Sequence, residues 1–354
     1  MATVLANLHP EGTVHGQVGD ATVPLSFSAP SDEYKVLRER AAVLDLSGHR
    51  LVEVTGAGAN EFAQRVLARD VEYLTSERCM MSLVLDESGQ VVDQVLAFGR
   101  EDGILLESSC GAGTRLIEHL RQQNDEGVEI TDRSGELTVL ALEGPYAWGV
   151  VGRLIDGELA SLPFESVVDT TWNGVDIIFA RTGFTGEYGY QMIVPVDAAA
   201  ELWRQSLEHA GPAGLEALEL AMLEVRQPIP RHEAVGGASV IEIGANWLVD
   251  VTKDEFVGRA AVLAAFESGQ GRRTVGFAGG DTVPAAGARV LACGEDIGEV
   301  VHAVRSAGLG STLGLARVDA DLAAAGLEFT VDGVEVTTLT SPYIVPKSWS
   351  IPII

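Results

Sequence analysis

A glycine-rich stretch near the middle of the chain, residues 181–191 with the sequence RTGFTGEYGYQ, places the strongest constraint on the fold. Strand-forming runs flank it at 175–180 and 191–196, so it is predicted to form the tip of a hairpin. Glycine adopts backbone angles closed to other residues and lets another group approach the main chain. Aromatic side chains supply flat apolar walls, and Glu187 offers two acceptor oxygens to paired N–H donors. Such a loop would suit the binding of a planar heterocycle with an amidine-like edge. The alternative is that it is an ordinary glycine-rich turn.

The length and the order of the predicted elements indicate more than one domain. A chain of 354 residues exceeds one typical core. Up to Gly271, helical patterns such as the one over residues 31–44 alternate with strands, and beyond it short strands with many glycines follow. We therefore predict an α+β fold in which mixed modules precede a C-terminal β-domain.

The charge balance limits the partners of the chain. Its 24 lysine and arginine residues against 51 aspartate and glutamate residues give a net charge of −27 and a pI of about 4.5. Such a field repels phosphate backbones, so we expect no nucleic-acid partner. No apolar run approaches the roughly 20 residues that span a bilayer, and the N-terminus lacks the pattern of a signal peptide. We expect a cytoplasmic protein without a membrane partner.

The cysteines give no sign of a disulfide framework or a metal centre. Cys79, Cys110 and Cys293 are far apart in the sequence and odd in number. No cysteine and histidine cluster has the spacing of metal ligands. We expect three buried free thiols and no metal site.

Several separate motifs follow one known pattern. Residues 181–191 resemble the signature RTG(Y/F)TGE.G(Y/F)E, residues 42–47 (AVLDLS) look like glfDlS, residues 142–145 (LEGP) match LqGP, and residues 256–259 (FVGR) match FiGr. In these motifs the chain resembles the glycine-cleavage T-protein, or aminomethyltransferase, superfamily, and the resemblance extends over nearly its whole length.

The resemblance implies a fold and a cofactor. The fold would be a three-lobed disc of two mixed α/β domains and a C-terminal β-domain around a central opening. That opening would hold tetrahydrofolate or its 5-methyl or 5,10-methylene form. The domains would be residues 1–47 with 137–236, residues 48–136 with 237–267, and a barrel or jelly-roll-like domain over 268–354. Glu187, with Tyr188 beside it, would hold the amino-pyrimidine edge of the pterin. Trp247 would form part of the pocket wall or be a plain core residue.

A glutamine occupies the position of the family's main catalytic carboxylate. Residues 88–93 (SGQVVD) stand where the family has GGiiDD, which puts Asp93 at the first aspartate and Gln94 at the second. Glutamine cannot take up a proton or balance an iminium cation, but it can orient a ligand. Because neighbouring residues of a strand point to opposite faces, Asp93 can take the place of the carboxylate missing at position 94 only if the strand has a bulge or a register change. Both residues are catalytic candidates.

Other contacts of the cofactor are also replaced. Met81 stands where the family often has a tyrosine beside the cofactor, and Met222 where it has an arginine close to folate. Arg226, one helical turn beyond Met222, is a candidate for the same ligand, and a helix-dipole role is its alternative. His232 falls where the family chain lines the opening, either as an acid or base or as a structural residue.

These replacements favour a tetrahydrofolate-dependent one-carbon transferase other than the housekeeping glycine-cleavage component. Methyl transfer between folate and a small-molecule donor or acceptor needs a leaving-group acid more than an iminium-stabilising carboxylate. We therefore expect methyl transfer or demethylation. Two alternatives stay open: a glycine-cleavage aminomethyltransferase working with a carrier protein, and a non-catalytic folate-binding regulatory protein.

Overall fold

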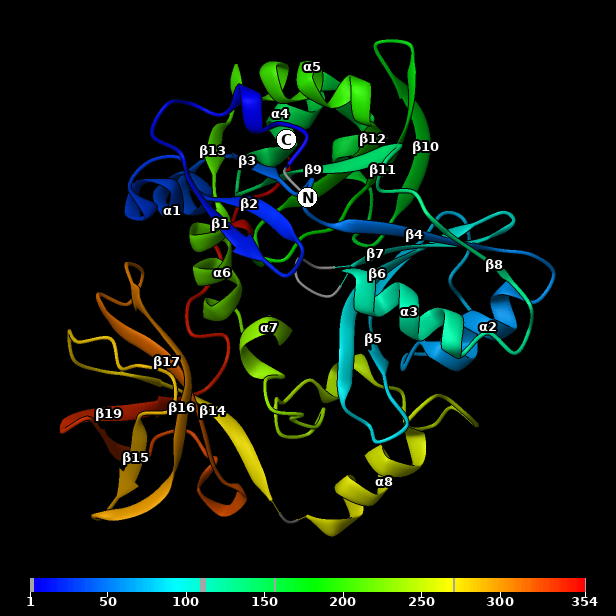
Figure 1. The fold of residues 1–354 in the computed structure, drawn as a ribbon. Helices are drawn as coiled ribbons and strands as arrows, with labels where there is room; N and C mark the ends of the chain where they lie inside the picture. The colour runs from blue at the N-terminus through cyan, green and yellow to red at the C-terminus, as the bar shows by residue number, and fades with distance from the viewer. Residues whose placement is uncertain (1–2, 109–112, 156, 270, 354) are drawn as a thin grey trace.

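The computed structural model describes residues 3–108, 113–155, 157–269 and 271–353. Within these ranges the strands form a two-stranded ribbon, a six-stranded sheet, a five-stranded sheet and a closed six-stranded barrel (Figure 1). Helices accompany the two large sheets, whereas the barrel follows at the C-terminal end. This arrangement confirms the prediction of an α+β fold with a C-terminal β-domain.

The six-stranded sheet combines an early strand with strands from the middle of the chain. Its order is β10 (Val167–Trp172), β11 (Val175–Ala180), β12 (Gly189–Pro195), β9 (Leu137–Glu143), β3 (Ala42–Asp45) and β13 (Gly211–Ala213). Helices α4 (Ala147–Leu154) and α5 (Val196–Leu207) pack against it around the buried Trp203 and Tyr190. The antiparallel pairing of β11 with β12 makes the 181–188 segment the tip of a hairpin, as predicted.

One helix prediction was wrong at its C-terminal end. Helix α1 spans Pro30–Glu39 and stops well before residue 44, because residues 42–45 form β3. The apolar side chains of Val43 and Leu44 fit the helical period, but they also suit a fully buried strand. Pairing with β9 on one side and β13 on the other satisfies the backbone there and decides between the two.

The five-stranded sheet has one face covered by helices and one face turned to the middle of the molecule. Its order is β5 (Cys79–Leu85), β6 (Val91–Arg100), β7 (Gly103–Ser108), β4 (Arg50–Thr55) and β8 (Glu129–Asp132). Helices α2 (Ala59–Val66) and α3 (Gly113–Gln122) pack on one face through Phe62 and Leu116. On the other face, Leu83 and Leu96 share a core with residues of the six-stranded sheet. This inner face is therefore placed to border a site between the two sheets.

The chain after residue 236 returns to the five-stranded sheet. Ser239 pairs with Gln90, and the buried Lys253 ammonium donates to the carbonyl oxygens of Gln64, Leu67 and Arg69. Helix α8 (Arg259–Ser268) follows. These contacts join the segment to elements of the five-stranded sheet. The assignment of residues 237–267 to the second lobe stays a prediction.

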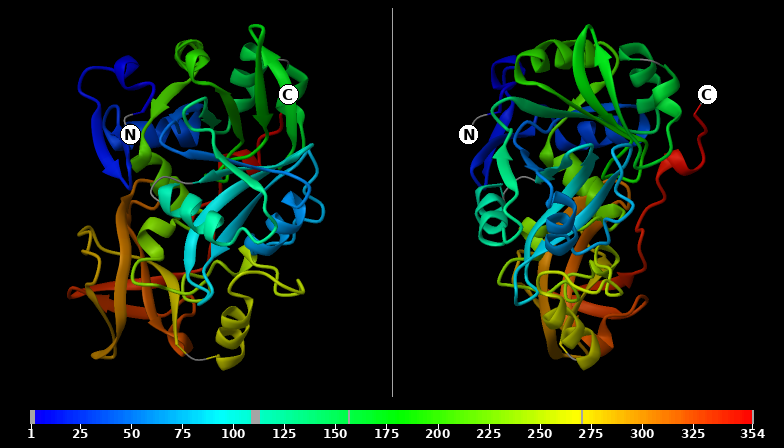
Figure 2. Two further views of the ribbon diagram at one scale, coloured as in Figure 1. Left: turned by 45° about the vertical axis from the view of Figure 1, so that its right-hand side comes forward. Right: turned by 90° about the vertical axis from the view of Figure 1, so that its right-hand side faces the viewer.

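The barrel sends a long C-terminal segment back to the six-stranded sheet. Its strands are β14 (Arg272–Ala278), β17 (Ser311–Asp319), β16 (Glu295–Ser306), β15 (Arg289–Ala292), β18 (Glu328–Val331) and β19 (Val334–Leu339). Beyond β19 the chain leaves the barrel and runs along one side of the molecule (Figure 2). Helices α6 (Leu215–Glu224) and α7 (Pro230–Glu233) lie between the barrel and the sheets, and β1 (Val14–Val18) and β2 (Ala21–Ser26) form the ribbon.

One cysteine is exposed, contrary to the expectation that all three thiols are buried. Cys79 is buried as predicted and burial raises its pKa to about 12, but Cys293 is exposed, and Cys110 lies outside the described residues. Cys293 follows β15 at the turn before β16, where its backbone is left-handed and its side chain has no core to enter. No helix in the described part of the chain is long and apolar enough to cross a membrane.

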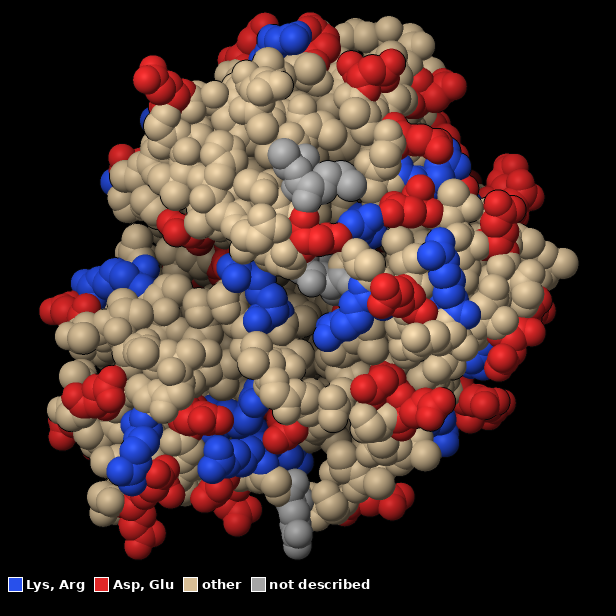
Figure 3. Space-filling view, viewed as in Figure 1, with Lys and Arg blue, Asp and Glu red and all other residues tan. Residues whose placement is uncertain are grey.

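Acidic side chains are scattered over the face seen in Figure 3, with basic ones between them. At a net charge of −27 the folded chain repels itself, and salt screens that repulsion. Raising KCl from about 0.1 to 1 M shortens the screening length from about 10 to 3 Å. We expect the thermal unfolding midpoint, followed by circular dichroism, to rise by several degrees. An uncharged osmolyte at matched osmolality is the control, and a midpoint that stays constant or falls in KCl would contradict the expectation.

Candidate functional site

A cavity lies where the five-stranded sheet, the 181–188 loop and helices α6 and α7 meet. It holds about 510 Å³ of empty space, part of it open solvent. Most of its lining is apolar, and polar groups are few and come from different elements. The lining includes His49 and Gln94 from the sheet region, Phe184 from the loop, Leu218, Glu219 and Met222 from α6, and Pro230 and Arg231 from α7.

Gln94 and Asp93 lie on opposite faces of β6. Gln94 points to the cavity, and its Nε2 donates to Sδ of Met81 at 3.1 Å. Its Oε1 is buried and has no hydrogen-bond partner among the described residues. Asp93 points to the helix-covered face, where it accepts a 2.6 Å hydrogen bond from Ser108. The pairing of β6 with β5 shifts register at Val92, but Asp93 still faces Ser108. Asp93 therefore lies outside the cavity, and of the two candidates only Gln94 borders it.

A second group of polar side chains lies behind the cavity wall, and the sequence analysis did not predict it. Nδ1 of His49 lies 2.6 Å from Oε1 of Glu107 on β7, and Gln191 of β12 donates to that same oxygen at 3.4 Å. Oε2 of Glu107 and Oε1 of Gln191 are buried and lack partners among the described residues. The sequence signal that could have revealed these residues is a polar residue inside an otherwise apolar strand. Glu107 stands in the sequence ILLES and Gln191 in YQMIV. Buried unpaired acceptors are costly, so they indicate a ligand or water at this place.

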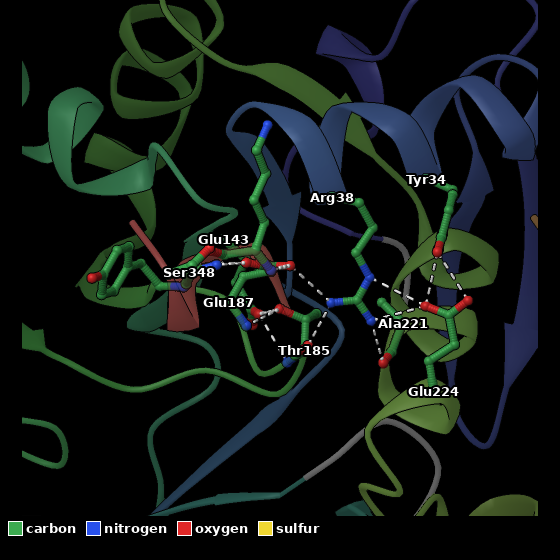
Figure 4. A network of polar contacts seen from close by, with 11 residues as sticks. Tyr34, Arg38, Glu143, Thr185, Glu187, Ala221, Glu224 and Ser348 are labelled. Atoms are coloured by element: carbon green, nitrogen blue, oxygen red, sulfur yellow. Dashed lines mark hydrogen bonds and ion pairs between the residues drawn. The ribbon is translucent and has the colours of Figure 1, made fainter. Parts of the chain in front are cut away.

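The carboxylate of Glu187 holds the C-terminal segment of the chain. Its oxygens accept hydrogen bonds from the backbone N–H groups of Lys347 and Ser348 at 3.0 and 2.8 Å and from the Ser348 hydroxyl at 2.6 Å. Arg38 adds an ion pair at 3.3 Å (Figure 4). Glu187 is buried and does not line the cavity. Its two acceptor oxygens serve paired N–H donors, as the loop chemistry predicted, but the donors here belong to the protein.

The neighbouring residues of the loop are fixed in the same way. Tyr188 donates its backbone N–H to Ser348 and its hydroxyl to the carbonyl oxygen of Ile351, outside the cavity. The buried carboxylate of Glu143 accepts the N–H groups of Phe184 and Thr185. Burial raises the pKa of Glu143, although these hydrogen bonds oppose the rise. At Gly189 a Cβ atom would lie 2.6 Å from the Thr182 carbonyl oxygen, so the tight return of the loop requires glycine. These contacts hold the loop in place, and Phe184 of the loop lines the cavity.

Two further sequence candidates lie away from the cavity. Arg226 forms a bidentate ion pair with Glu233 and donates to the carbonyl oxygen of Ile243, so its guanidinium is used within the protein. Trp247 is 52% exposed and is neither a cavity wall nor a core residue. Met222 lines the cavity, and Met81 stands behind Gln94, where Gln227 also donates to its sulfur at 2.8 Å.

His232 belongs to a charged group at the α7 side of the cavity. Its ring stacks on that of His302 at 4.0 Å, and its Nε2 lies 3.3 Å from Glu219. Burial alone would raise the pKa of Glu219, but hydrogen bonds from His232 and Arg231 hold it below its ordinary value. Burial, followed by the charge of His232, lowers the pKa of His302 to about 4. Glu219 and Arg231 reach the cavity wall from this group, whereas His232 does not.

Comparison with known proteins identifies the family. Residues 5–253 match the GCVT N-terminal domain, and residues 272–341 match the glycine cleavage T-protein C-terminal barrel domain. The chain belongs to the glycine-cleavage T-protein family. It is 33% identical over 325 residues to an aminomethyltransferase of Geobacillus thermodenitrificans, with 89% of each chain covered. It is likewise 33% identical over 300 residues to one of Rubrobacter xylanophilus, covering 84% of this chain and 81% of that protein.

A solved structure supports the fold of this T-protein family member. The glycine cleavage system aminomethyltransferase T from Bartonella henselae superposes with a TM-score of 0.89 at 22% identity, covering 97% of this chain and 98% of the other. The family signature at residues 181–191 thus lies on a fold of the expected kind. In this member its first glutamate, Glu187, anchors the C-terminal segment, and its last position is Gln191, behind the cavity wall.

Replacing Glu187 with glutamine tests its anchoring role in this T-protein. Two backbone donors and the Arg38 charge would lose a buried carboxylate, so we expect Glu187→Gln to lower the free energy of unfolding in urea by about 2–3 kcal/mol. Hydrogen exchange of residues 343–351 should accelerate with it. Ser348→Ala should give a smaller loss, and Glu295→Gln, an exposed site, should change neither quantity. Unchanged exchange of the segment in Glu187→Gln would rule out the anchor.

Proposed function

We propose that this protein binds tetrahydrofolate in the cavity and transfers a one-carbon unit to or from it. The observation that carries the proposal is a set of buried acceptor oxygens on Gln94, Glu107 and Gln191 that have no partner among the described residues, at or behind the wall of a largely apolar cavity. A pterin is flat and presents several N–H donors along its amino-pyrimidine edge, which is the complement of such a set. Membership of the aminomethyltransferase family supports the same cofactor.

The chain offers a pterin both kinds of contact that it needs. Phe184, Leu218 and Met222 supply apolar surface for the faces of the ring. Gln94 would supply an acceptor at the cavity wall while Glu107 holds His49, and Gln191, behind that wall, would take the part that the sequence assigned to Glu187. Tetrahydrofolate, once bound, would supply the nitrogen that carries the one-carbon unit, and the chain's own residues would orient it and exclude water.

Kinship favours aminomethyl transfer as the reaction. Relatives that cover most of this chain at about one third identity are named aminomethyltransferase. We infer that the protein accepts a one-carbon unit from an aminomethyl group and passes it to folate, with a carrier protein as donor. Of the two candidate reactions, aminomethyl transfer has better support than methyl transfer.

Methyl transfer is the second candidate reaction. It is favoured by the uncharged side chain of Gln94 at the cavity wall. Gln94 is held by Met81, and Asp93 faces away, so β6 brings no carboxylate to the cavity. A developing iminium cation would lack the stabilisation that a carboxylate gives there. Transfer of an intact methyl group from a nitrogen, oxygen or sulfur atom of a small molecule does not pass through such a cation.

The cofactor assignment is tested by calorimetry. We expect tetrahydrofolate to bind the purified protein and Gln191→Leu to weaken the affinity about tenfold, because one acceptor for the pterin edge is lost. Gln122→Leu, on the exposed side of α3, should bind as the wild type does. If the wild-type protein shows no heat of binding with tetrahydrofolate, the proposed function is abandoned.

The choice between the two reactions is tested at position 94. Gln94→Asp restores a carboxylate to the cavity wall, so an aminomethyltransferase should gain about tenfold or more in the transfer rate from an aminomethyl-loaded lipoyl carrier to tetrahydrofolate. Gln94→Asn, which is equally short but neutral, is the matched control. If the wild type and both variants are inactive with the carrier while tetrahydrofolate binds, aminomethyl transfer is excluded and methyl transfer becomes the leading candidate.

A further inference from the structure

The cavity wall contains few groups that can carry a proton. Of the described side chains that line it, the ionisable ones are His49, Glu219 and Arg231. Arg231 stays protonated at any physiological pH. Glu219 accepts hydrogen bonds from Arg231 and His232, which hold its pKa below the ordinary value and keep it ionised. Imidazole ordinarily titrates between pH 5 and 8, so His49 is the lining group suited to giving and taking a proton.

The structure holds the ring of His49 in one orientation. Its Nδ1 is 2.6 Å from Oε1 of Glu107, whose side chain is 1% exposed, and the same oxygen accepts from Gln191. A carboxylate at Nδ1 keeps the proton on that nitrogen and so makes Nε2 the nitrogen that exchanges protons. His49 lies between β3 and β4 and borders the same cavity as Gln94. The pair therefore combines a fixed imidazole with a buried negative charge directly behind it.

We propose that His49, oriented by Glu107, is the acid–base residue of this cavity. This inference rests on the proposed function and assigns the proton transfer that Gln94 cannot perform. As the bond between the transferred carbon and the donor heteroatom breaks, its electron pair stays on the heteroatom, and the imidazolium of His49 donates a proton to that atom. His49 then takes back the proton that folate N5 loses when it bonds to the carbon. The protonation of the protein is the same before and after, and no further reactant is needed.

The charges around His49 act in opposite directions. Glu107 stabilises the imidazolium from behind, while Glu219 and Arg231, across the cavity, form an ion pair with each other and largely cancel. Asp93 lies on the far face of the sheet. Arg50, next in the chain, pairs with Asp20 and Asp132 at the surface. Glu107 is therefore the positioning residue, and His49 is the group placed to touch the reactants.

Nitrogen NMR of the labelled protein gives a readout that does not depend on turnover. The ring of His49, assigned by comparison with His49→Gln, should show the Nδ1–H tautomer, and its nitrogen shifts should move when (6S)-tetrahydrofolate is added. Glu107→Gln should abolish the tautomer preference. The ring of His209, which is exposed at the end of α5, should not respond to the ligand. A His49 ring that is unchanged by bound tetrahydrofolate would overturn the proposal.

The pH dependence of binding and transfer provides the second test. The dissociation constant of tetrahydrofolate should change about threefold or more between pH 5.5 and 8 in the wild type and be flat in His49→Gln. Transfer should fall about 100-fold or more in His49→Gln and less in Glu107→Gln, with His209→Gln as control. If tetrahydrofolate binds and His49→Gln keeps the wild-type pH profile and rate, only this inference fails. If tetrahydrofolate does not bind the wild type, the proposed function fails with it.

Discussion

The buried guanidinium of Arg38 joins the parts of the protein that surround the cavity. From α1 it donates to the Thr185 carbonyl at 2.7 Å and the Ala221 carbonyl at 2.8 Å, and it pairs with Glu187 and Glu224 (Figure 4). Each carboxylate also accepts hydrogen bonds from other donors. Two negative charges can therefore share one cation and still have all of their oxygens hydrogen-bonded. Removing one member would leave a buried charge without a partner, which usually costs several kcal/mol.

This network fixes the cavity because its members are also the supports of the cavity walls. Glu224 ends α6 and accepts hydrogen bonds from Tyr34 and from Ser306 of the barrel. Glu187 holds the end of the chain beside the loop that carries Phe184. The barrel, the C-terminal segment and α1 therefore set the position of α6 relative to the loop, although none of the three lines the cavity itself. The site is complete only when all of the chain is folded.

Much of the fold could be predicted from local patterns, whereas the partners of polar residues could not. The hairpin around residues 181–188 followed from strand runs on either side of a glycine-rich tip, and the β6 alternation placed Asp93 and Gln94 on opposite faces. The role of Glu187 was missed because its donors are about 160 residues away, in a segment without a motif. Gln191 and Glu107 could have been noticed as polar residues in apolar strands. Their proximity depends on how two separate sheets meet, which no local pattern encodes.

The replacement of a carboxylate by Gln94 changes what the cavity can stabilise. A carboxylate there would present a fixed negative charge to the ligand, but Gln94 offers only the dipole of an amide. Glu107, a buried carboxylate on the same sheet, stands behind His49 and acts through its ring. Glu219 across the cavity is ionised but paired with Arg231, so neither carboxylate presents an unpaired negative charge at the place of Gln94. A site of this kind suits a reaction in which a leaving heteroatom must receive a proton, more than one in which a cation must persist at the wall.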